Sequence, residues 1–377
     1  MRLRIQWLLL LLSLSLFSTS LATAASFTRL GVLPGGTTSE ARAISADGTT
    51  VAGQGRSSSG TQAFVWDNTN GIQGLGFLPG GGFSLARGVS GDGSNVVGQS
   101  SSSSGNRAFI WDATNGMQSL GVLPGGSFSE ANGISSDGTT VVGRGNSSTA
   151  SQEAFLWSAT NGIQGLGLLP GGSYTVGRGV SADGSRAAGQ GNSSTGSIEA
   201  FLWDSTSGIQ GLGLLPGGTF SIASAISADG SSVVGQGNSS LGSQGFIWDA
   251  TNGLQGIGRL LGGSNSQANA VSGDGSVVVG QGNSAIGPRG NQALIWDAVN
   301  GIRTVESELA ALGISTAGWT LNAAMGISAD GLSIAGFGIN PSGQREAWLA
   351  VIPEPTTGVL VMIGLLGLAG QRKEGAE

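Results

Sequence analysis

Side chains able to carry acid–base, nucleophilic or metal chemistry are few, because this chain of 377 residues contains no histidine and no cysteine. The usual proton carrier at neutral pH, the thiol nucleophile and the commonest metal ligand are therefore absent. Carboxylates remain, and the twelve aspartates occupy two kinds of position. Seven stand before a glycine: Asp47, Asp92, Asp137, Asp183, Asp229, Asp274 and Asp330. Five follow a tryptophan: Asp67, Asp112, Asp204, Asp249 and Asp297.

This regular placement favours a structural role for the aspartates. An aspartate in a turn bonds nearby backbone amides, whereas a catalytic carboxylate is expected to depart from a repeated pattern. A ring of aspartates holding Ca²⁺ is the alternative. Ca²⁺ takes roughly six to eight oxygens from clustered ligands, and a segment such as SADGS at 181–185 supplies one carboxylate. We therefore predict no catalytic, cofactor-binding or metal-binding residue and no cofactor.

Four glutamates are the other candidates for carboxylate chemistry: Glu40, Glu130, Glu306 and Glu308. Glycoside hydrolysis needs two carboxylates about 5–10 Å apart. Glu40 and Glu130 occupy equivalent places in a repeated segment, however, so they too are expected to be structural.

The repeated segment organises nearly the whole chain. Its copy at Leu120–Gly165 reads LGVLPGGSFSEANGISSDGTTVVGRGNSSTASQEAFLWSATNGIQG. A tryptophan marks each copy: Trp66, Trp111, Trp157, Trp203, Trp248, Trp296 and Trp348, at steps of 45, 46, 46, 45, 48 and 52 residues. A fixed period of this length is the signature of a repeat architecture.

Each copy contains four short segments with strand character. In one copy they are Ala131–Ser135, Thr139–Gly143, Glu153–Trp157 and Ile163–Leu169. Asp-Gly between the first two predicts a hairpin with a type I′ turn, in which both central residues have positive φ. Pro-Gly-Gly ends the unit, because proline and glycine favour turns.

The third segment is apolar on both faces, which predicts a sheet covered on both sides by its neighbours. Four-stranded sheets stacked around an axis satisfy this requirement. There are seven first and seven third strands but six fourth strands, and an unassigned strand lies at Phe27–Leu33. We predict an all-β fold, a seven-bladed β-propeller whose N-terminal strand completes the last blade. A β-solenoid is the alternative.

One insertion breaks the pattern. Between Gly301 and Ile327 the chain is eight residues longer than the equivalent stretch Gly116–Ile134, and Val305–Leu312 is expected to form a short helix. Trp319 lies off the tryptophan period. Loops on a rigid scaffold tend to carry function, so Trp319 marks a candidate ligand loop; a packing cap over the propeller end is the alternative.

The N-terminal segment 1–24 has the features of a secretory signal peptide. Arg2 and Arg4 precede an apolar run at Leu8–Phe17, and Ala22 and Ala24 form an A-x-A cleavage pattern. An uncleaved membrane anchor is the alternative. The body of the protein, a propeller over 25–352, is then exported.

The C-terminal segment 353–377 joins Pro353-Glu354-Pro355 to an apolar stretch, Thr356–Gly370, and to Arg372 and Lys373. It resembles the PEP-CTERM sorting signal, which exosortases read in Gram-negative bacteria that make extracellular polysaccharide. The resemblance implies a transmembrane helix at 356–370 that holds the protein in the inner membrane before processing. A plain membrane anchor is the alternative.

The repeat resembles the HAF repeat of bacterial extracellular proteins in the pieces LPGG, ISADG, VVGQ and AFLWD. The resemblance implies a secreted repeat protein and no particular activity. The histidine for which that repeat is named is replaced throughout, by Gln62, Arg107, Glu153, Glu199, Gln244, Gln292 and Glu346.

Charge excludes one class of partner. Six charged residues lie in the terminal segments outside the Pro353-Glu354-Pro355 motif: Arg2, Arg4, Arg372, Lys373, Glu374 and Glu377. Without them, 16 basic and 22 acidic residues become 12 and 20, a net charge of −8. An acidic body without lysine does not suit nucleic acid.

We expect a non-enzymatic repeat protein of the cell envelope or extracellular matrix. It acts as a structural or interaction module and is sorted by signal peptidase and an exosortase. Loops rich in Ser, Asn, Gln and Trp suit extracellular polysaccharide as a ligand. The alternative is a carbohydrate-active propeller enzyme.

Overall fold

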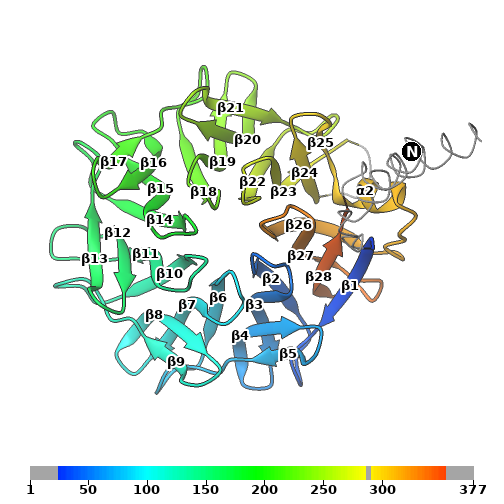
Figure 1. Ribbon diagram of the computed structural model, residues 1–377, viewed down its shortest axis with the longest axis horizontal. Helices are drawn as coiled ribbons and strands as arrows, with labels where there is room; N and C mark the ends of the chain where they lie inside the picture. The colour runs from blue at the N-terminus through cyan, green and yellow to red at the C-terminus, as the bar shows by residue number, and fades with distance from the viewer. Residues whose placement is uncertain (1–23, 286–289, 354–377) are drawn as a thin grey trace, which may run out of the picture. The chain divides into compact units, whose positions relative to one another are not determined.

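Seven four-stranded antiparallel sheets follow one another around a ring in the computed structural model, which describes residues 24–285 and 290–353 (Figure 1). The predicted seven-bladed β-propeller is therefore confirmed, and the β-solenoid alternative is wrong. The first strand of each blade lies innermost and the fourth lies outermost (Figure 1).

The blades are numbered here in chain order, and the first four have the following strands. Blade I contains β2 (Ser39–Ile44), β3 (Thr50–Ser57), β4 (Gly60–Asp67) and β5 (Gly71–Gly74). Blade II contains β6 (Ser84–Val89), β7 (Val96–Ser102), β8 (Gly105–Asp112) and β9 (Gly116–Ser119). Blade III contains β10 (Ser129–Ile134), β11 (Thr140–Gly145), β12 (Glu153–Ser158) and β13 (Gly162–Gly167). Blade IV contains β14 (Thr175–Val180), β15 (Arg186–Asn192), β16 (Ile198–Asp204) and β17 (Gly208–Gly211).

The last three blades include the one that joins the two ends of the chain. Blade V contains β18 (Ser221–Ile226), β19 (Ser232–Ser239), β20 (Gly242–Asp249) and β21 (Gly253–Gly258). Blade VI contains β22 (Ser266–Val271), β23 (Val277–Asn283), β24 (Asn291–Asp297) and β25 (Gly301–Thr304). Blade VII contains β26 (Thr320–Ile327), β27 (Ser333–Ile339), β28 (Arg345–Val351) and β1 (Ser26–Gly31). The predicted helix in the insertion is present as α2 (Val305–Ala311).

The hydrophobic core lies between blades rather than inside one of them. Ala52 and Val65 of blade I share a buried cluster with Val96 and Phe109 of blade II, and similar clusters recur around the ring. Burying a side chain such as Phe109 contributes about 1.5–3 kcal/mol. A blade on its own would expose both faces, so the repeats stabilise one another.

The hairpin turns between first and second strands differ from the prediction. A type I′ turn needs positive φ at the aspartate as well as the glycine, but Ala317 is the only described non-glycine residue with positive φ. Asp47 Oδ1 instead accepts hydrogen bonds from Ser45 Oγ and from the amide of Thr49 at 3.0 Å. The type I′ prediction is therefore wrong, because side-chain bonds stabilise a turn with negative φ at the aspartate.

These seven turns are connected to one another by backbone hydrogen bonds between neighbouring blades. The amide of Gly91 donates to the carbonyl of Ser136 (2.8 Å), and the amide of Asp47 donates to the carbonyl of Gly91 (3.3 Å). The bonds between them run through Ser136, Ala182, Ala228, Gly273, Ala329 and Ala46. The turns thus form a closed ring at one end of the seven innermost strands.

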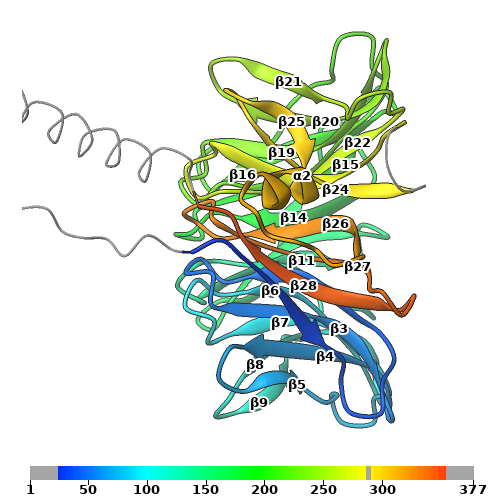
Figure 2. The ribbon, with the colours of Figure 1, turned by 90° about the vertical axis from the view of Figure 1, so that its right-hand side faces the viewer.

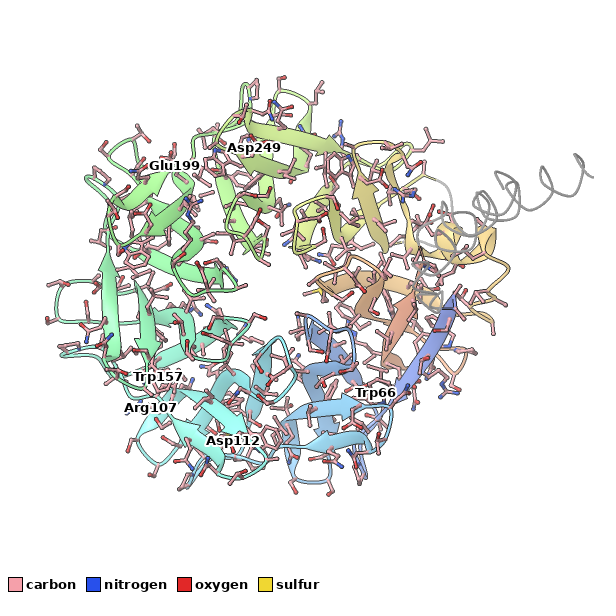
Figure 3. All side chains as sticks on the ribbon, viewed as in Figure 1. Trp66, Arg107, Asp112, Trp157, Glu199 and Asp249 are labelled. Carbon is pink, nitrogen blue, oxygen red and sulfur yellow. The ribbon has the colours of Figure 1, made fainter. Side chains whose placement is uncertain are left out.

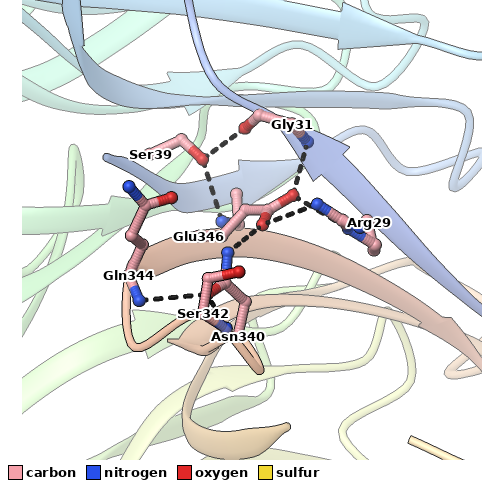
Figure 4. A network of polar contacts seen from close by, with 8 residues as sticks. Arg29, Gly31, Ser39, Asn340, Ser342, Gln344 and Glu346 are labelled. Atoms are coloured by element: carbon pink, nitrogen blue, oxygen red, sulfur yellow. Dashed lines mark hydrogen bonds and ion pairs between the residues drawn. The ribbon is translucent and has the colours of Figure 1, made fainter. Parts of the chain in front are cut away.

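The N-terminal strand closes the propeller as predicted. β1 pairs with β28 in antiparallel register from Ser26 opposite Val351, and the two strands lie side by side in Figure 2. The carboxylate of Glu346 on β28 is 2% exposed and accepts hydrogen bonds from the Gly31 amide (3.2 Å) and from Asn340 Nδ2 (2.7 Å) (Figure 4). Arg29 pairs with it at 3.3 Å. This group of contacts, centred on one buried carboxylate, ties β1 to β28.

The prediction that Trp348 continues the tryptophan period is wrong. It lies opposite Gly336 on β27, as Phe64 lies opposite Gly53 in blade I, so it occupies the phenylalanine position. Ala350 takes the place of the repeated tryptophan. Trp348 lies two residues before the position of the repeated tryptophan. Spacing alone does not reveal this difference, because the insertion before blade VII changes the distance from Trp296.

Both terminal segments are largely outside the described residues. The predicted signal peptide up to residue 23, with Ala22, and the sorting segment from Glu354, with the predicted helix 356–370, belong to those parts. Within residues 24–285 and 290–353, no helix combines the length and apolar character needed to cross a bilayer.

Candidate functional site in the central channel

A β-bulge in every innermost strand decides which side chain lines the centre of the propeller. In β2 the register shifts between Ala41 and Ala43, so Arg42 has no partner residue on β3. Bulges bend a strand and re-aim side chains. The equivalent bulged residues are Arg87, Asn132, Arg178, Ser224, Asn269 and Met325.

All seven bulged residues line a central cavity of about 420 Å³. Two positions further along the strands, the lining changes to aliphatic side chains such as Ile44, Val89 and Ile134. The cavity therefore has a polar layer and, closer to the ring of hairpin turns, an apolar layer.

Positive charge is concentrated on one side of the polar layer. Arg42, Arg87 and Arg178 come from blades I, II and IV, with Asn132 of blade III between the last two. Blades V to VII contribute the uncharged Ser224, Asn269 and Met325. Although the body is acidic, its central cavity presents an arc of guanidinium groups facing an uncharged arc.

Glu40 and Glu130, the carboxylates considered for hydrolysis, are both held by arginines. Glu40 is 8% exposed and accepts hydrogen bonds from Arg42 (2.6 Å) and Arg345 (2.5 Å). Glu130 is 9% exposed and pairs with Arg144 at 2.8 Å. Both carboxylates are therefore engaged in ion pairs with arginines of the described structure.

Arg87 and Arg178 differ from Arg42 because neither forms an ion pair with any described residue. The Nε atom of each is buried and has no hydrogen-bond partner. Burial lowers the pKa of both guanidinium groups, and the charge of Arg144 lowers both further. Glu130 opposes this shift in both cases. Arg178 Nη2 donates a hydrogen bond to Gln190 Oε1 at 3.4 Å. The cavity is thus lined by two largely buried cations that have no counter-ion among the described residues and whose Nε atoms lack a hydrogen-bond partner.

The aspartates have the turn roles that their spacing predicts. Asp112 Oδ1 accepts the amides of Thr114 and Asn115, both at 2.8 Å, and Figure 3 shows Asp112 and Asp249 in the outer part of the ring. Hydrogen bonds from Ser181 and Ser185 lower the pKa of Asp183 to about 2. In the described part of the chain, no three carboxylates lie close enough together to hold a metal ion.

The insertion packs against the closing blade. Trp319 is 5% exposed and contacts Phe27 edge-to-face, with ring centroids 5.4 Å apart. It shares a buried cluster with Val305 and Leu309 of α2. On the same helix, Glu308 pairs with Arg303 at 2.7 Å. Trp319 offers little surface to a ligand, and its environment favours the packing cap.

Sequence reasoning missed the channel arginines. Their signal was one repeat position occupied by Arg, Arg, Asn, Arg, Ser, Asn and Met, between positions that are small or aliphatic in every copy. A variable polar position inside an otherwise uniform strand is unusual. Without the bulge, however, nothing in the sequence shows that this position faces the axis.

Comparisons with known proteins identify the fold alone. No family model matches the chain, and no curated protein sequence matches it. An oligogalacturonate lyase solved in complex with manganese is similar, with a TM-score of 0.54, 15% identity, and coverage of 88% of this chain and 94% of that chain. The oligogalacturonate lyase of Vibrio parahaemolyticus has a TM-score of 0.55 at 12% identity, covering 88% and 98%.

Two further solved structures are also similar to this chain. The β-propeller domain of the Trilobed protease from Pyrococcus furiosus has a TM-score of 0.52 at 11% identity, covering 87% of this chain and 96% of that chain. TolB from Acinetobacter baumannii has a TM-score of 0.46 at 14% identity, and this chain spans 61% of its length. The similar structures include enzymes. Because their sequence identity to this chain is low, the similarity identifies only the propeller architecture.

Proposed function

We propose that the protein is a non-enzymatic, exported binding module of the cell envelope or extracellular matrix, with extracellular polysaccharide as its ligand. The proposal includes membership of the HAF-repeat proteins and sorting by a PEP-CTERM signal. It rests on the repeated segment, on the sequences of the two terminal segments, and on the hydrogen bonds and ion pairs that the carboxylates form.

One observation carries the non-enzymatic part: the carboxylates that could do chemistry are occupied by structural bonds. Each of the twelve aspartates accepts hydrogen bonds within its own turn, as Asp47 and Asp112 do. Glu40 and Glu130, the acids near the channel, are held by arginines. Catalysis by this chain would first have to release one of them.

The register of the closing blade supports processing at both ends. Because Ser26 lies opposite Val351, the chain enters and leaves the propeller at one place on blade VII. The predicted cleavage after Ala24 and the sorting motif beginning at Pro353 each lie within two residues of that place. Both segments can therefore be removed without cutting a strand of the ring.

Intact-mass spectrometry of protein from the envelope and the medium of an exosortase-bearing host tests the sorting. We expect a mature chain that begins near Ala25 and ends near Pro353-Glu354-Pro355. A chain that retains 356–377 in every fraction contradicts sorting and indicates a plain anchor.

Catalysis is the second candidate, because Glu40 and Glu130 are buried next to the arginines of the channel. Incubation with extracellular polysaccharides and measurement of new reducing or unsaturated ends distinguishes the two functions. We expect binding without cleavage. Cleavage that disappears in Glu40→Gln or Glu130→Gln would establish the enzyme instead.

A further inference from the structure

The central cavity contains an unusual electrostatic feature that the fold itself does not need. Three described side-chain nitrogen atoms are buried without a hydrogen-bond partner, and two of them are Nε of Arg87 and Nε of Arg178. Leaving a buried donor unsatisfied is unfavourable, and so is burying a charge without a counter-ion. Replacing these arginines would not break any ion pair of the described structure.

The neighbours of these two arginines do not neutralise them. Arg42 and Arg144 add positive charge at Arg87, and Arg144 and Arg87 add it at Arg178. Glu130 is the carboxylate that acts on both, but it already binds Arg144 at 2.8 Å. An anionic ligand in the cavity would supply the missing counter-charge.

The two ends of the channel are not equivalent for such an anion. The hairpin turns at one end place seven exposed aspartates around it: Asp47, Asp92, Asp137, Asp183, Asp229, Asp274 and Asp330. Their charge repels an anion from that side. At the other end the innermost strands begin, and Arg345 lies there with its side chain 51% exposed. Access is therefore expected from the end where the first strands start.

The remaining lining indicates what kind of anion fits. A planar guanidinium binds carboxylate and phosphate oxygens in a two-pronged geometry. Opposite the arginines, Ser224, Gln267 and Asn269 offer uncharged hydrogen-bonding groups suited to hydroxyls. A volume of about 420 Å³ is far larger than a single ion and falls within the roughly 300–1,000 Å³ of organic-ligand sites.

From these observations we infer that the channel is a binding site for a carboxylated sugar, whose carboxylate lies between Arg87 and Arg178 and whose hydroxyls face blades V and VI. The inference rests on the proposed function, because it names the class of polysaccharide that the module binds. An acidic polysaccharide would insert the uronate unit at its chain end.

Calorimetric titration of the exported protein tests the ligand class. The probes are a glucuronic acid hexasaccharide, the same hexasaccharide after reduction of its carboxyl groups, and inorganic phosphate. We expect the acidic hexasaccharide to bind at least tenfold more tightly than the reduced one, with affinity that falls as salt rises. Phosphate alone should bind weakly, since it leaves the uncharged arc unoccupied.

Variants test the site. Arg87→Gln and Arg178→Gln are each expected to weaken binding of the acidic hexasaccharide about tenfold or more, while the control Arg56→Gln, an exposed position on β3, leaves it unchanged. Arg87→Lys should retain part of the affinity, because it keeps the charge but loses the planar geometry. Thermal unfolding of each variant confirms that the fold is kept.

Three outcomes would overturn the inference. Equal binding of the acidic and the reduced hexasaccharides would keep the polysaccharide-binding function but remove the carboxylate from it. Acidic binding that neither Arg87→Gln nor Arg178→Gln weakens would place the ligand outside the channel. Binding of phosphate but of no glycan in an array would reject both this ligand class and the proposed function.

Discussion

Glu346 offers the sharpest test of how the ring is closed, through the change Glu346→Ala. Its carboxylate accepts hydrogen bonds from Asn340 Nδ2 (2.7 Å) and from the Gly31 amide (3.2 Å). Each buried donor left without an acceptor costs about 1–3 kcal/mol. The pair with Arg29 adds less than ~1 kcal/mol, since that side chain is 65% exposed. Relief from burying a charge offsets part of the sum, so we expect a loss of about 3 kcal/mol.

The conservative variant Glu346→Gln should also be destabilising, by about 1–2 kcal/mol. In either orientation its amide group would turn an N–H toward a donor, because Asn340 Nδ2 donates to one carboxylate oxygen and the Gly31 amide to the other. Asn340 cannot rotate its amide to compensate, because Oδ1 accepts the amides of Ser342 and Gln344, both at 3.0 Å (Figure 4).

The matched control is Glu199→Ala, at the equivalent position of blade IV. There the carboxylate accepts one hydrogen bond, from the Gly213 amide at 2.8 Å, so a loss of about 1 kcal/mol is expected. Urea unfolding followed by tryptophan fluorescence measures both variants, and hydrogen exchange locates the effect. In Glu346→Ala, amides of β1 should exchange faster than those of blades II to V. A loss no greater than that of the control, or faster exchange spread evenly over all blades, would refute the reasoning.

Three further predictions concern the channel, the turns and the core. Arg87→Gln should raise the thermal midpoint even as it weakens ligand binding, because it removes a buried cation without a partner; a lower midpoint would contradict this. The pKa of Asp183 falls from 3.8 to about 2 on folding, so its stabilisation is complete above pH 3.8 and is lost as the pH falls toward 2. Urea midpoints between pH 5 and 2 should therefore depend less steeply on pH in Asp183→Asn, and identical slopes would count against the turn role. Gly143→Ala should be strongly destabilising, by about 3 kcal/mol, because its new Cβ would collide with the Glu130 carbonyl oxygen and lie 2.6 Å from Cζ of Phe155. Gly82→Ala, whose Cβ would meet nothing within 4 Å, should unfold at nearly the wild-type urea concentration.

The misread elements show where a repeat argument fails. The residue type of Trp348 predicts that it continues the tryptophan period. Backbone pairing sets the position of a residue in a strand, however, and β28 places Trp348 opposite Gly336. The pair Asp47-Gly48 by itself predicts a type I′ turn. Its neighbours Ser45 and Thr49 decide the conformation instead, because their hydrogen bonds to the carboxylate hold the aspartate at negative φ.

The sequence by itself determined the period, the number of blades and the strand that closes the ring. Those features depend on local turn residues and on apolar strands that must be covered on both faces. The Asp-Gly turn and the apolar third strand each occur seven times in the chain. It also determined that the aspartates are structural, because every one obeys the repeat. The tertiary structure alone decided that Arg87 and Arg178 line one central cavity. They are separated by 91 positions in the chain, and a bulge in each innermost strand aims them inward. Convergence of distant residues around a symmetry axis is a property of the closed ring, and no single repeat contains it.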